Sequence, residues 1–289
     1  MIITEAVDQF LADLASDGRS PHTVAAYRRD LKVFIRFAGD TIITDVTPAV
    51  LTAFMATQGV QVRPCGASRA KASINRYRVS LKALFAWCGD RWLIERNPTS
   101  ILKCRRHRAL PPEILTKAEV AMLTEFSFGG KWAERDRTLI QFMLATGCRL
   151  GETVTLSVGD IDFERSRVIL RNPKGGEPET VPMTRVILDQ LCVTTGDTEL
   201  THPLFRTGTG NRLSCRQVQR IVARRCIEAG IKKTITPHSL RHTFATKLYN
   251  QTGDIRLVQV ALRHESIATT QTYAQLDHSR LQTALGANS

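Results

Sequence analysis

The sequence of 289 residues contains no apolar run long enough to cross a membrane. Its longest nearly apolar stretch, residues 139–148 (LIQFMLATGC), is interrupted by Gln141, whereas a spanning helix needs about 20 apolar residues. The first residues, MIITEAVDQF, also lack the basic segment followed by an apolar segment that marks a secretory signal peptide. We therefore expect a cytoplasmic protein without a membrane partner.

Cysteine pairs are absent as well. The seven cysteines are widely and irregularly spaced and form no CxxC motif, which argues against a disulfide framework and against a structural zinc site. His238 and His242 have the i, i+4 spacing of a zinc-binding pair, but the central glutamate of HExxH is missing and no third ligand is evident. We expect no metal and no cofactor.

Acidic residues are few, since 27 Asp and Glu stand against 40 Lys and Arg and leave a net charge of +13. A magnesium nuclease needs two or three convergent carboxylates. Asp160, Asp162 and Glu164 alternate outside every basic motif, and we interpret them as a surface loop. Thirty of the basic residues are arginine, whose planar guanidinium suits phosphate. The charge therefore favours a polyanionic partner.

Apolar residues recur at helical spacing in the first hundred residues. Ser20-Pro21 and Thr47-Pro48 are residue pairs typical of helix starts. We expect a four-helix domain over residues 1–102, followed by a basic, proline-containing linker over residues 103–112. Basic residues that could contact a polyanion lie beside the last of these helices: Arg69, Lys71, Arg76 and Arg78.

The remaining residues, 113–289, predict a second, mixed domain. Thr116 and Glu119 form a capping box at its first helix, and further helices are expected over 134–146, over 214–229 and from Thr236-Pro237 onward. Two short strands, 168–170 and 179–183, flank a hairpin turn with Lys174 at its tip. Three arginines share one face of the 214–229 helix, as either a DNA-tracking stripe or a solvated surface: Arg216, Arg220 and Arg224. The fold class is thus mainly α with a small antiparallel β-sheet.

Four segments occur in an order that resembles the tyrosine recombinase (phage integrase) family. They are TGCRLGE at 146–152, NPKGGEPETVP at 172–182, HSLRHTFAT at 238–246 and RHESIATTQTYA at 263–274. SPHTVAAYRRDLKVF is similar to the family's SAM-like core-binding domain, and LPPEILTKAEV is similar to the entry of its catalytic domain. The resemblance covers nearly the whole chain and is strongest to Xer-type recombinases and short integrases of mobile elements.

The resemblance implies a role for each matching residue. Arg149 and Arg241 would clamp the scissile phosphate, and Tyr273 would attack it to form a 3′-phosphotyrosyl link. The other assignments are Lys174 as the general acid for the 5′-oxygen, His238 in proton transfer around the tyrosine, His264 as a hydrogen-bond donor to the phosphate, and Glu152 as support for Arg149 and His238. Tyr249 is the nearby competitor as nucleophile, although its position suits packing. The sequence departs from the family at Arg263, where a small residue is usual, so the local turn could differ or a phosphate contact could be added.

The implied activity is site-specific recombination of duplex DNA, by a two-domain, C-shaped clamp that works without a metal. The tail after Tyr273 would dock into a neighbouring protomer and arrange a homo- or hetero-tetrameric synaptic complex. Two alternatives stay open: a catalytically silent DNA-binding or architectural protein on the same fold, and a type IB topoisomerase-like activity. Integration, excision and chromosome-dimer resolution are equally open as biological roles.

Overall fold

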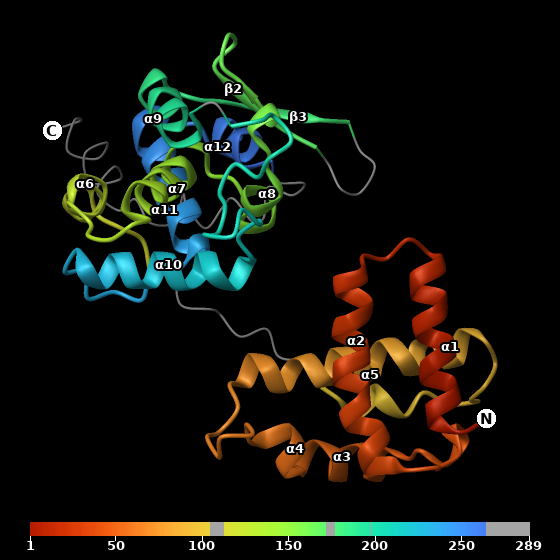
Figure 1. The fold of residues 1–289 in the computed structure, drawn as a ribbon. Helices are drawn as coiled ribbons and strands as arrows, with labels where there is room; N and C mark the ends of the chain where they lie inside the picture. Colours follow the sequence, from red (N-terminus) through yellow and green to blue (C-terminus); the bar gives the residue numbers. More distant parts are fainter. Residues whose placement is uncertain (105–112, 172–176, 197, 264–289) are drawn as a thin grey trace, which may run out of the picture. The chain divides into compact units, whose positions relative to one another are not determined.

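The computed structural model describes residues 1–104, 113–171, 177–196 and 198–263. Their contacts divide the chain into two compact units, Met1–Ala109 and Leu110–Ser289, and each has its own hydrophobic core (Figure 1).

The first unit consists of helices and the loops that join them. Its elements are α1 (Ile3–Ser16), α2 (Pro21–Ala38), η1 (Ile43–Asp45, a 3₁₀-helix), α3 (Pro48–Ala56), α4 (Gln58–Gln61), α5 (Lys71–Asp90) and the 3₁₀-helix η2 (Pro98–Ile101). The helix starts follow the predicted caps, since the side chains of Ser20 and Thr47 accept hydrogen bonds from the backbone N–H groups of Thr23 and Val50. The expected number of four helices was wrong, because the single turn of α4 is too short to show an apolar repeat.

Aromatic side chains form the centre of the first core. Phe34 of α2 packs edge to face against Phe54 of α3, with ring centroids 5.0 Å apart, and against Phe85 of α5. All three rings are buried. Edge-to-face packing of this kind adds about 0.5–1.5 kcal/mol per pair to the gain from burial, and here it ties α2, α3 and α5 into one body.

The second unit is mixed. Its elements are α6 (Lys117–Glu125), α7 (Ala133–Thr146), α8 (Leu150–Thr155), η3 (Val158–Asp160), β1 (Ile161–Asp162), β2 (Arg167–Leu170), β3 (Glu179–Pro182), α9 (Arg185–Thr195), α10 (Cys215–Glu228), α11 (Pro237–Thr252) and α12 (Ile255–Leu262). The predicted fold class, mainly α with a small antiparallel sheet, is confirmed. Throughout the described ranges no helix combines the length and the apolar character that crossing a membrane requires.

The sheet has the strand order β1-β2-β3, and both pairs of strands are antiparallel. In the β2–β3 pair Val168 lies opposite Val181, and both face the core, as the period-two alternation of a half-buried strand requires. The interpretation of residues 160–164 as a surface loop was wrong at its start. Asp160 is only 5% exposed, and its carboxylate binds the guanidinium of Arg171 at 2.6 Å.

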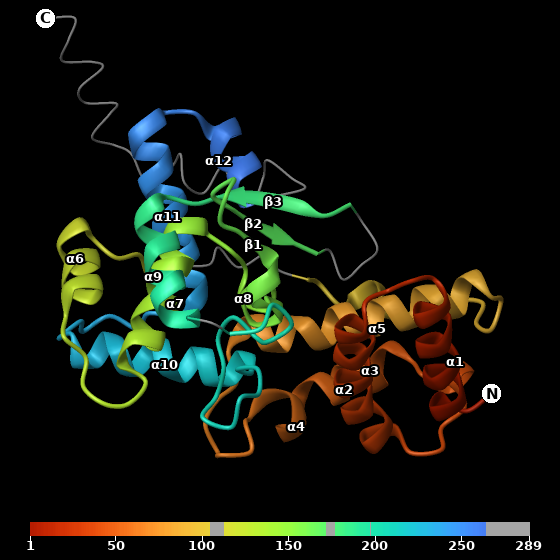
Figure 2. The same cartoon turned by 45° about the horizontal axis from the view of Figure 1, so that its top comes forward.

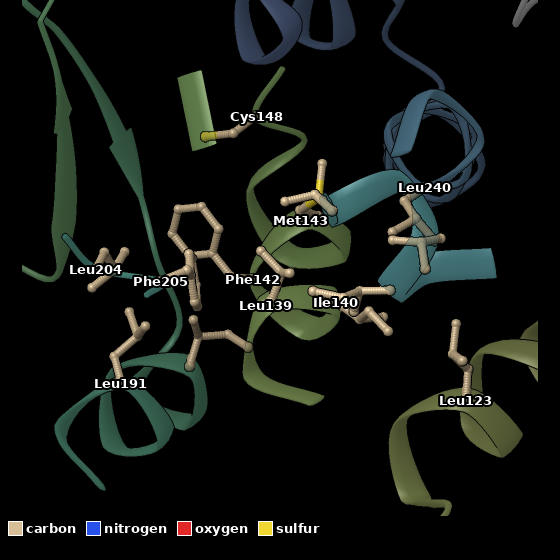
Figure 3. Close-up of a cluster of buried hydrophobic side chains, with 14 of the residues drawn as sticks. Leu123, Leu139, Ile140, Phe142, Met143, Cys148, Leu191, Leu204, Phe205 and Leu240 are labelled. Atoms are coloured by element: carbon tan, nitrogen blue, oxygen red, sulfur yellow. The ribbon is translucent and has the colours of Figure 1, made fainter. Parts of the chain in front are cut away.

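Helix α7 lies at the centre of the second unit and contacts α6, α9, α10 and α11 (Figures 1 and 2). Its Leu139, Ile140, Phe142 and Met143 side chains are buried on several sides of the helix. Figure 3 shows them between Leu191, Leu204 and Phe205 on one side and Leu123 and Leu240 on the other. A helix apolar on most of its surface is a core helix, and α7 thereby fixes the position of the segment that follows it.

A buried carboxylate joins α7 to α10. Asp136 is fully buried, and its oxygens contact the guanidinium groups of Arg135 at 2.5 Å, Arg224 at 2.8 Å and Arg225 at 2.7 Å. Arg225 is itself only 3% exposed and also lies over the ring of Phe128. One buried carboxylate therefore contacts three guanidinium groups, of which Arg225 and Arg224 also pair with Glu228.

Replacing Asp136 by alanine is expected to lower the free energy of unfolding by about 3 kcal/mol, because the buried Arg225 would keep only the more exposed Glu228 as an acidic partner among the described residues. Urea-induced unfolding of the full chain, followed by circular dichroism, measures the change. Glu134→Ala is the matched control on the same helix, since this exposed carboxylate pairs with the guanidinium of Arg137 and its loss should change stability by about 0.5 kcal/mol or less. Equal effects of the two substitutions would contradict the structural role of Asp136.

Candidate active site

The site begins at the sharp turn that follows α7. Gly147 caps that helix with φ 61° and ψ 18°, a left-handed conformation that glycine adopts without strain. A β-carbon at this position would also overlap the ring of Phe244. The turn places Arg149 directly before α8, where its backbone N–H and its Nη1 donate to the two carboxylate oxygens of Glu152 at 2.6 and 2.8 Å. Glu152 therefore holds both the backbone and the guanidinium of Arg149.

Arg241 approaches the same place from α11. Thr236 caps this helix through the N–H of Ser239, and Pro237 occupies its first turn. Arg241 lies on the inner face and is 4% exposed. Its Nη1 donates to the backbone carbonyl of Gly147, and its Nη2 donates to the backbone carbonyl of Leu262. The buried guanidinium thus connects α11 with the turn after α7 and with the end of α12.

The two arginines meet at the C-terminal end of α12. Arg149 Nη2 donates to the carbonyl of Arg263 at 2.8 Å, and Arg241 Nη2 donates to the carbonyl of the preceding residue, Leu262. Because consecutive carbonyls hold them, these guanidinium groups from positions far apart in the sequence lie beside each other. Arg149 is the more open of the two, with 46% of its side chain exposed.

His238 lies one helical turn before Arg241 on α11, and its Nε2 is 2.8 Å from the Nε2 of His242. The pKa of His238 is lowered by desolvation and, to a smaller extent, by the positive charge of Arg241. A lowered pKa favours the neutral ring near pH 7, and a neutral imidazole can accept a proton. Within the described ranges no group of three or more His, Cys, Asp or Glu side chains is arranged to hold a metal ion.

Three predicted catalytic residues, Lys174, His264 and Tyr273, lie outside the described residues. The described neighbours that bracket them are Arg171, Glu177 and Arg263. The structure therefore brings together Arg149, Glu152 and Arg241, with His238 on the same helix as Arg241.

The basic residues predicted to contact DNA differ in their surroundings. Arg69 donates to the carbonyls of Gly59, Val60 and Val62, and Arg76 pairs with Asp30 at 2.7 Å. Lys71 and Arg78 line a cavity of about 470 Å³ in the first unit together with Lys103.

On α10, Arg224 is engaged by the buried carboxylate of Asp136. Arg216 and Arg220 are exposed on the same helix, and neither forms an ion pair within the described part of the chain. The stripe of three arginines is therefore divided: one cation serves the core of the second unit, and two face outward.

One arrangement in the site was not predicted. The side chain of Arg263 is 7% exposed, and its Nη2 binds the Glu152 carboxylate at 2.6 Å. The sequence marks this residue as a departure from the family at the position before His264. It gives no sign of the partner, because Glu152 lies 111 residues away.

Two guanidinium groups from distant parts of the sequence, those of Arg149 and Arg241, are held by consecutive carbonyls at the end of α12, and such a pair suits a phosphate or another anion. Comparison with known proteins identifies the fold that carries it. Residues 113–280 match the phage integrase family, and residues 7–91 match the phage integrase N-terminal SAM-like domain. The chain therefore belongs to the phage integrase family.

Individual relatives agree with this assignment. The chain is 32% identical over 284 residues to the tyrosine recombinase XerC of Chromobacterium violaceum, covering 96% of this chain and 92% of that protein. The structure of the Tn1549 transposon integrase in complex with transposon right end DNA has a TM-score of 0.75 at 20% identity and covers 98% of this chain and 100% of that chain. The structure of the XerH site-specific recombinase bound to palindromic difH has a TM-score of 0.71 at 22% identity, and the match covers 91% of this chain and 79% of that chain. The predicted class, a site-specific tyrosine recombinase that cuts and rejoins DNA, is confirmed.

Proposed function

We propose that this recombinase uses Tyr273 as its nucleophile and Arg149 with Arg241 as its phosphate clamp. The convergence of the two guanidinium groups on the carbonyls of Leu262 and Arg263 carries the proposal. Two cations held side by side match the charge that grows on the non-bridging oxygens of a phosphate under attack. The Arg241 charge lies in a buried, low-dielectric setting, where its effect on the phosphate exceeds that of a charge in water.

The chemistry is a pair of transesterifications. The Tyr273 oxygen bonds to phosphorus, its proton passes toward neutral His238, and the bond between phosphorus and the 5′-oxygen breaks. Lys174 donates a proton to the departing 5′-oxygen, and His264 donates a hydrogen bond to a phosphate oxygen. The 3′-phosphotyrosyl link conserves the energy of the phosphodiester, so a 5′-hydroxyl can reverse the step and rejoin the strand without ATP.

The partner is a duplex DNA recombination site. Residues 1–102 serve as the core-binding domain, residues 103–112 as the linker and residues 113–289 as the catalytic domain of a C-shaped clamp. Exposed Arg216 and Arg220 supply phosphate contacts, and each phosphate neutralised adds a slope of about −0.9 to the dependence of log K on log salt. Docking of residues 278–289 into a neighbouring protomer arranges the tetrameric synaptic complex, and the protein acts in the cytoplasm.

A nicked suicide substrate that contains the native site tests the proposed chemistry. Cleavage beside a nick releases a short fragment, so the covalent adduct accumulates and can be seen on a denaturing gel. We expect the wild-type chain to form this adduct at an undiminished rate in EDTA, because the clamp supplies the charge that a metal would otherwise provide. Absence of any adduct would favour a silent DNA-binding protein, and a strict magnesium requirement would contradict the metal-free mechanism.

The same protein, assayed on intact duplexes that carry two sites, separates recombination from topoisomerase-like action. Exchange of strands between the sites is the expected product. Relaxation of supercoils without strand exchange would instead indicate the type IB activity.

A further inference from the structure

Arg263 has a backbone conformation that disfavours arginine. It caps α12 with φ 54° and ψ 49°, in the left-handed region. That region costs a residue with a β-carbon about 1–2 kcal/mol, whereas glycine adopts it freely. The cost must be offset by what the side chain does, and the side chain is nearly buried against the site, with 7% of its surface exposed.

The guanidinium of Arg263 has two acidic neighbours of unequal strength. Its Nη2 donates to Glu152 Oε2 at 2.6 Å. Its Nε lies 3.1 Å from a Glu179 oxygen but makes no hydrogen bond there, and Glu179 is about half exposed. The strong partner is therefore Glu152, whose other oxygen accepts from Arg149 at 2.8 Å.

These contacts form a closed ring. Arg149 binds the Glu152 carboxylate, Glu152 binds the side chain of Arg263, and the carbonyl of Arg263 accepts a hydrogen bond from Arg149. One carboxylate thus orients two guanidinium groups, and the backbone of one of them holds the other. An orienting carboxylate that paired with Arg149 alone would neutralise much of its charge. Sharing that carboxylate with a second cation leaves the ring with a net positive charge.

The same contacts also determine the ionisation of Glu152. Burial raises the pKa of this carboxyl, but the charge of Arg263 and the hydrogen bonds from Arg149 together outweigh burial, so that its pKa lies below the usual value. Arg263 therefore helps to keep the orienting group ionised as the pH falls.

We propose that Arg263 is a positioning residue that shares Glu152 with Arg149, so that the carboxylate can orient Arg149 without cancelling its charge on the scissile phosphate. The proposal rests on the proposed function, because it assigns Arg149 to that phosphate. Arg263 itself does not touch the DNA in this role, which distinguishes it from an added phosphate contact.

The test compares single-turnover cleavage of two suicide substrates, one with the native phosphodiester and one with a neutral methylphosphonate at the scissile position. Removing the charge with Arg263→Gln should slow cleavage of the phosphodiester by about tenfold, because Glu152 then offsets the charge of Arg149 alone and weakens its attraction for the negative phosphate. Relative to wild type on the same substrate, the loss on the methylphosphonate should be less than about threefold, because that group carries no charge to neutralise.

Three further variants separate charge from folding. Arg263→Lys keeps the cation and should retain most of the activity. Arg263→Gly suits the left-handed backbone, so it should fold at least as stably as Arg263→Gln and yet show the same loss on the phosphodiester. Glu179→Gln removes the weaker neighbour and should stay within about twofold of wild type, because Glu152 remains in place.

The pH dependence supplies a second readout. Without Arg263 the pKa of Glu152 rises toward its ordinary value, so the acid limb of phosphodiester cleavage should move to higher pH in Arg263→Gln. A purely structural role would instead lower the rate by one factor at every pH and on both substrates, and that result would overturn the proposal, as would an unchanged rate. If the wild-type chain forms no adduct at all, the proposed function fails. If the wild-type chain forms the adduct and Arg263→Gln forms it at the same rate, this inference alone fails.

Discussion

Replacing Tyr273 by phenylalanine should abolish the covalent protein–DNA adduct. The substitution removes one oxygen atom, the atom proposed to attack phosphorus, and leaves the rest of the ring in place. Loss of a nucleophile is expected to reduce the cleavage rate by about 10⁴-fold or more, because the clamp alone cannot form the tyrosyl bond. End-labelled suicide substrate on a denaturing gel measures the adduct, and a gel-shift assay should show that DNA binding is retained.

Tyr249→Phe is the matched control. Tyr249 lies on α11 and packs against the small cluster formed by Ala245, Val258 and Leu262. Loss of its hydroxyl should leave adduct formation largely intact, since the ring supplies the packing. If the adduct persisted in Tyr273→Phe and disappeared in Tyr249→Phe, Tyr249 on α11 would be the nucleophile.

Arg241→Lys should produce the second large loss, about 10²–10³-fold in the rate of adduct formation. Lysine preserves the charge but presents a point charge on a flexible stem in place of a planar fork. It cannot hold the carbonyls of Gly147 and Leu262 together while it also faces a phosphate in the geometry of the arginine. Single-turnover cleavage measures the loss, and affinity for the uncleaved site should change far less.

Arg256→Lys provides the comparison for this substitution. Arg256 is exposed on α12, so exchanging its guanidinium for an ammonium should leave the cleavage rate within about twofold of wild type. The melting temperature of both variants must be measured, because Arg241 is buried. A wild-type rate in Arg241→Lys would show that cleavage does not require the guanidinium at this position. A slow rate in a stably folded variant would support its proposed role in binding the phosphate.

Local signals allowed the sequence to predict the longer helices. The caps at Ser20, Thr47, Thr116 and Thr236 all accept the expected backbone hydrogen bonds. These signals lie within four residues of the bonds that they make, so they can be seen without knowledge of the fold.

Three helices of the second unit, α8, α9 and α12, were not predicted from the sequence. Helix α8 has only six residues and is capped by the Arg149–Glu152 pair, which the sequence shows as part of a motif. Helix α9 begins at Arg185, and the side chain of its N-cap residue Thr184 makes no capping bond. The sequence does carry a start signal for α12, since Asp254 is a favoured N-cap residue and accepts from the N–H groups of Arg256 and Leu257.

The family resemblance names residues for the site but gives no information on their geometry. The resemblance to the family indicated Arg149, Glu152 and Arg241, and the structure places them together. The contacts that hold them there join Arg149 to Arg263 and Arg241 to Leu262 across long separations in the sequence. No periodicity or cap records such contacts, since they depend on how α8, α11 and α12 pack.

The arrangement of Arg149 and Arg241 depends on the local folding and unfolding of the end of α12. This helix has eight residues, and an isolated helix of that length is unstable in water, so its last turn depends on its contacts. Those contacts include Arg149 and Arg241, which lose their carbonyl partners at the end of α12 whenever the turn frays. By thermodynamic reciprocity, an anion that draws the two guanidinium groups together also favours the folded turn. The fraction of molecules in which this turn is folded therefore rises when phosphate binds, and the affinity for phosphate depends in turn on that fraction.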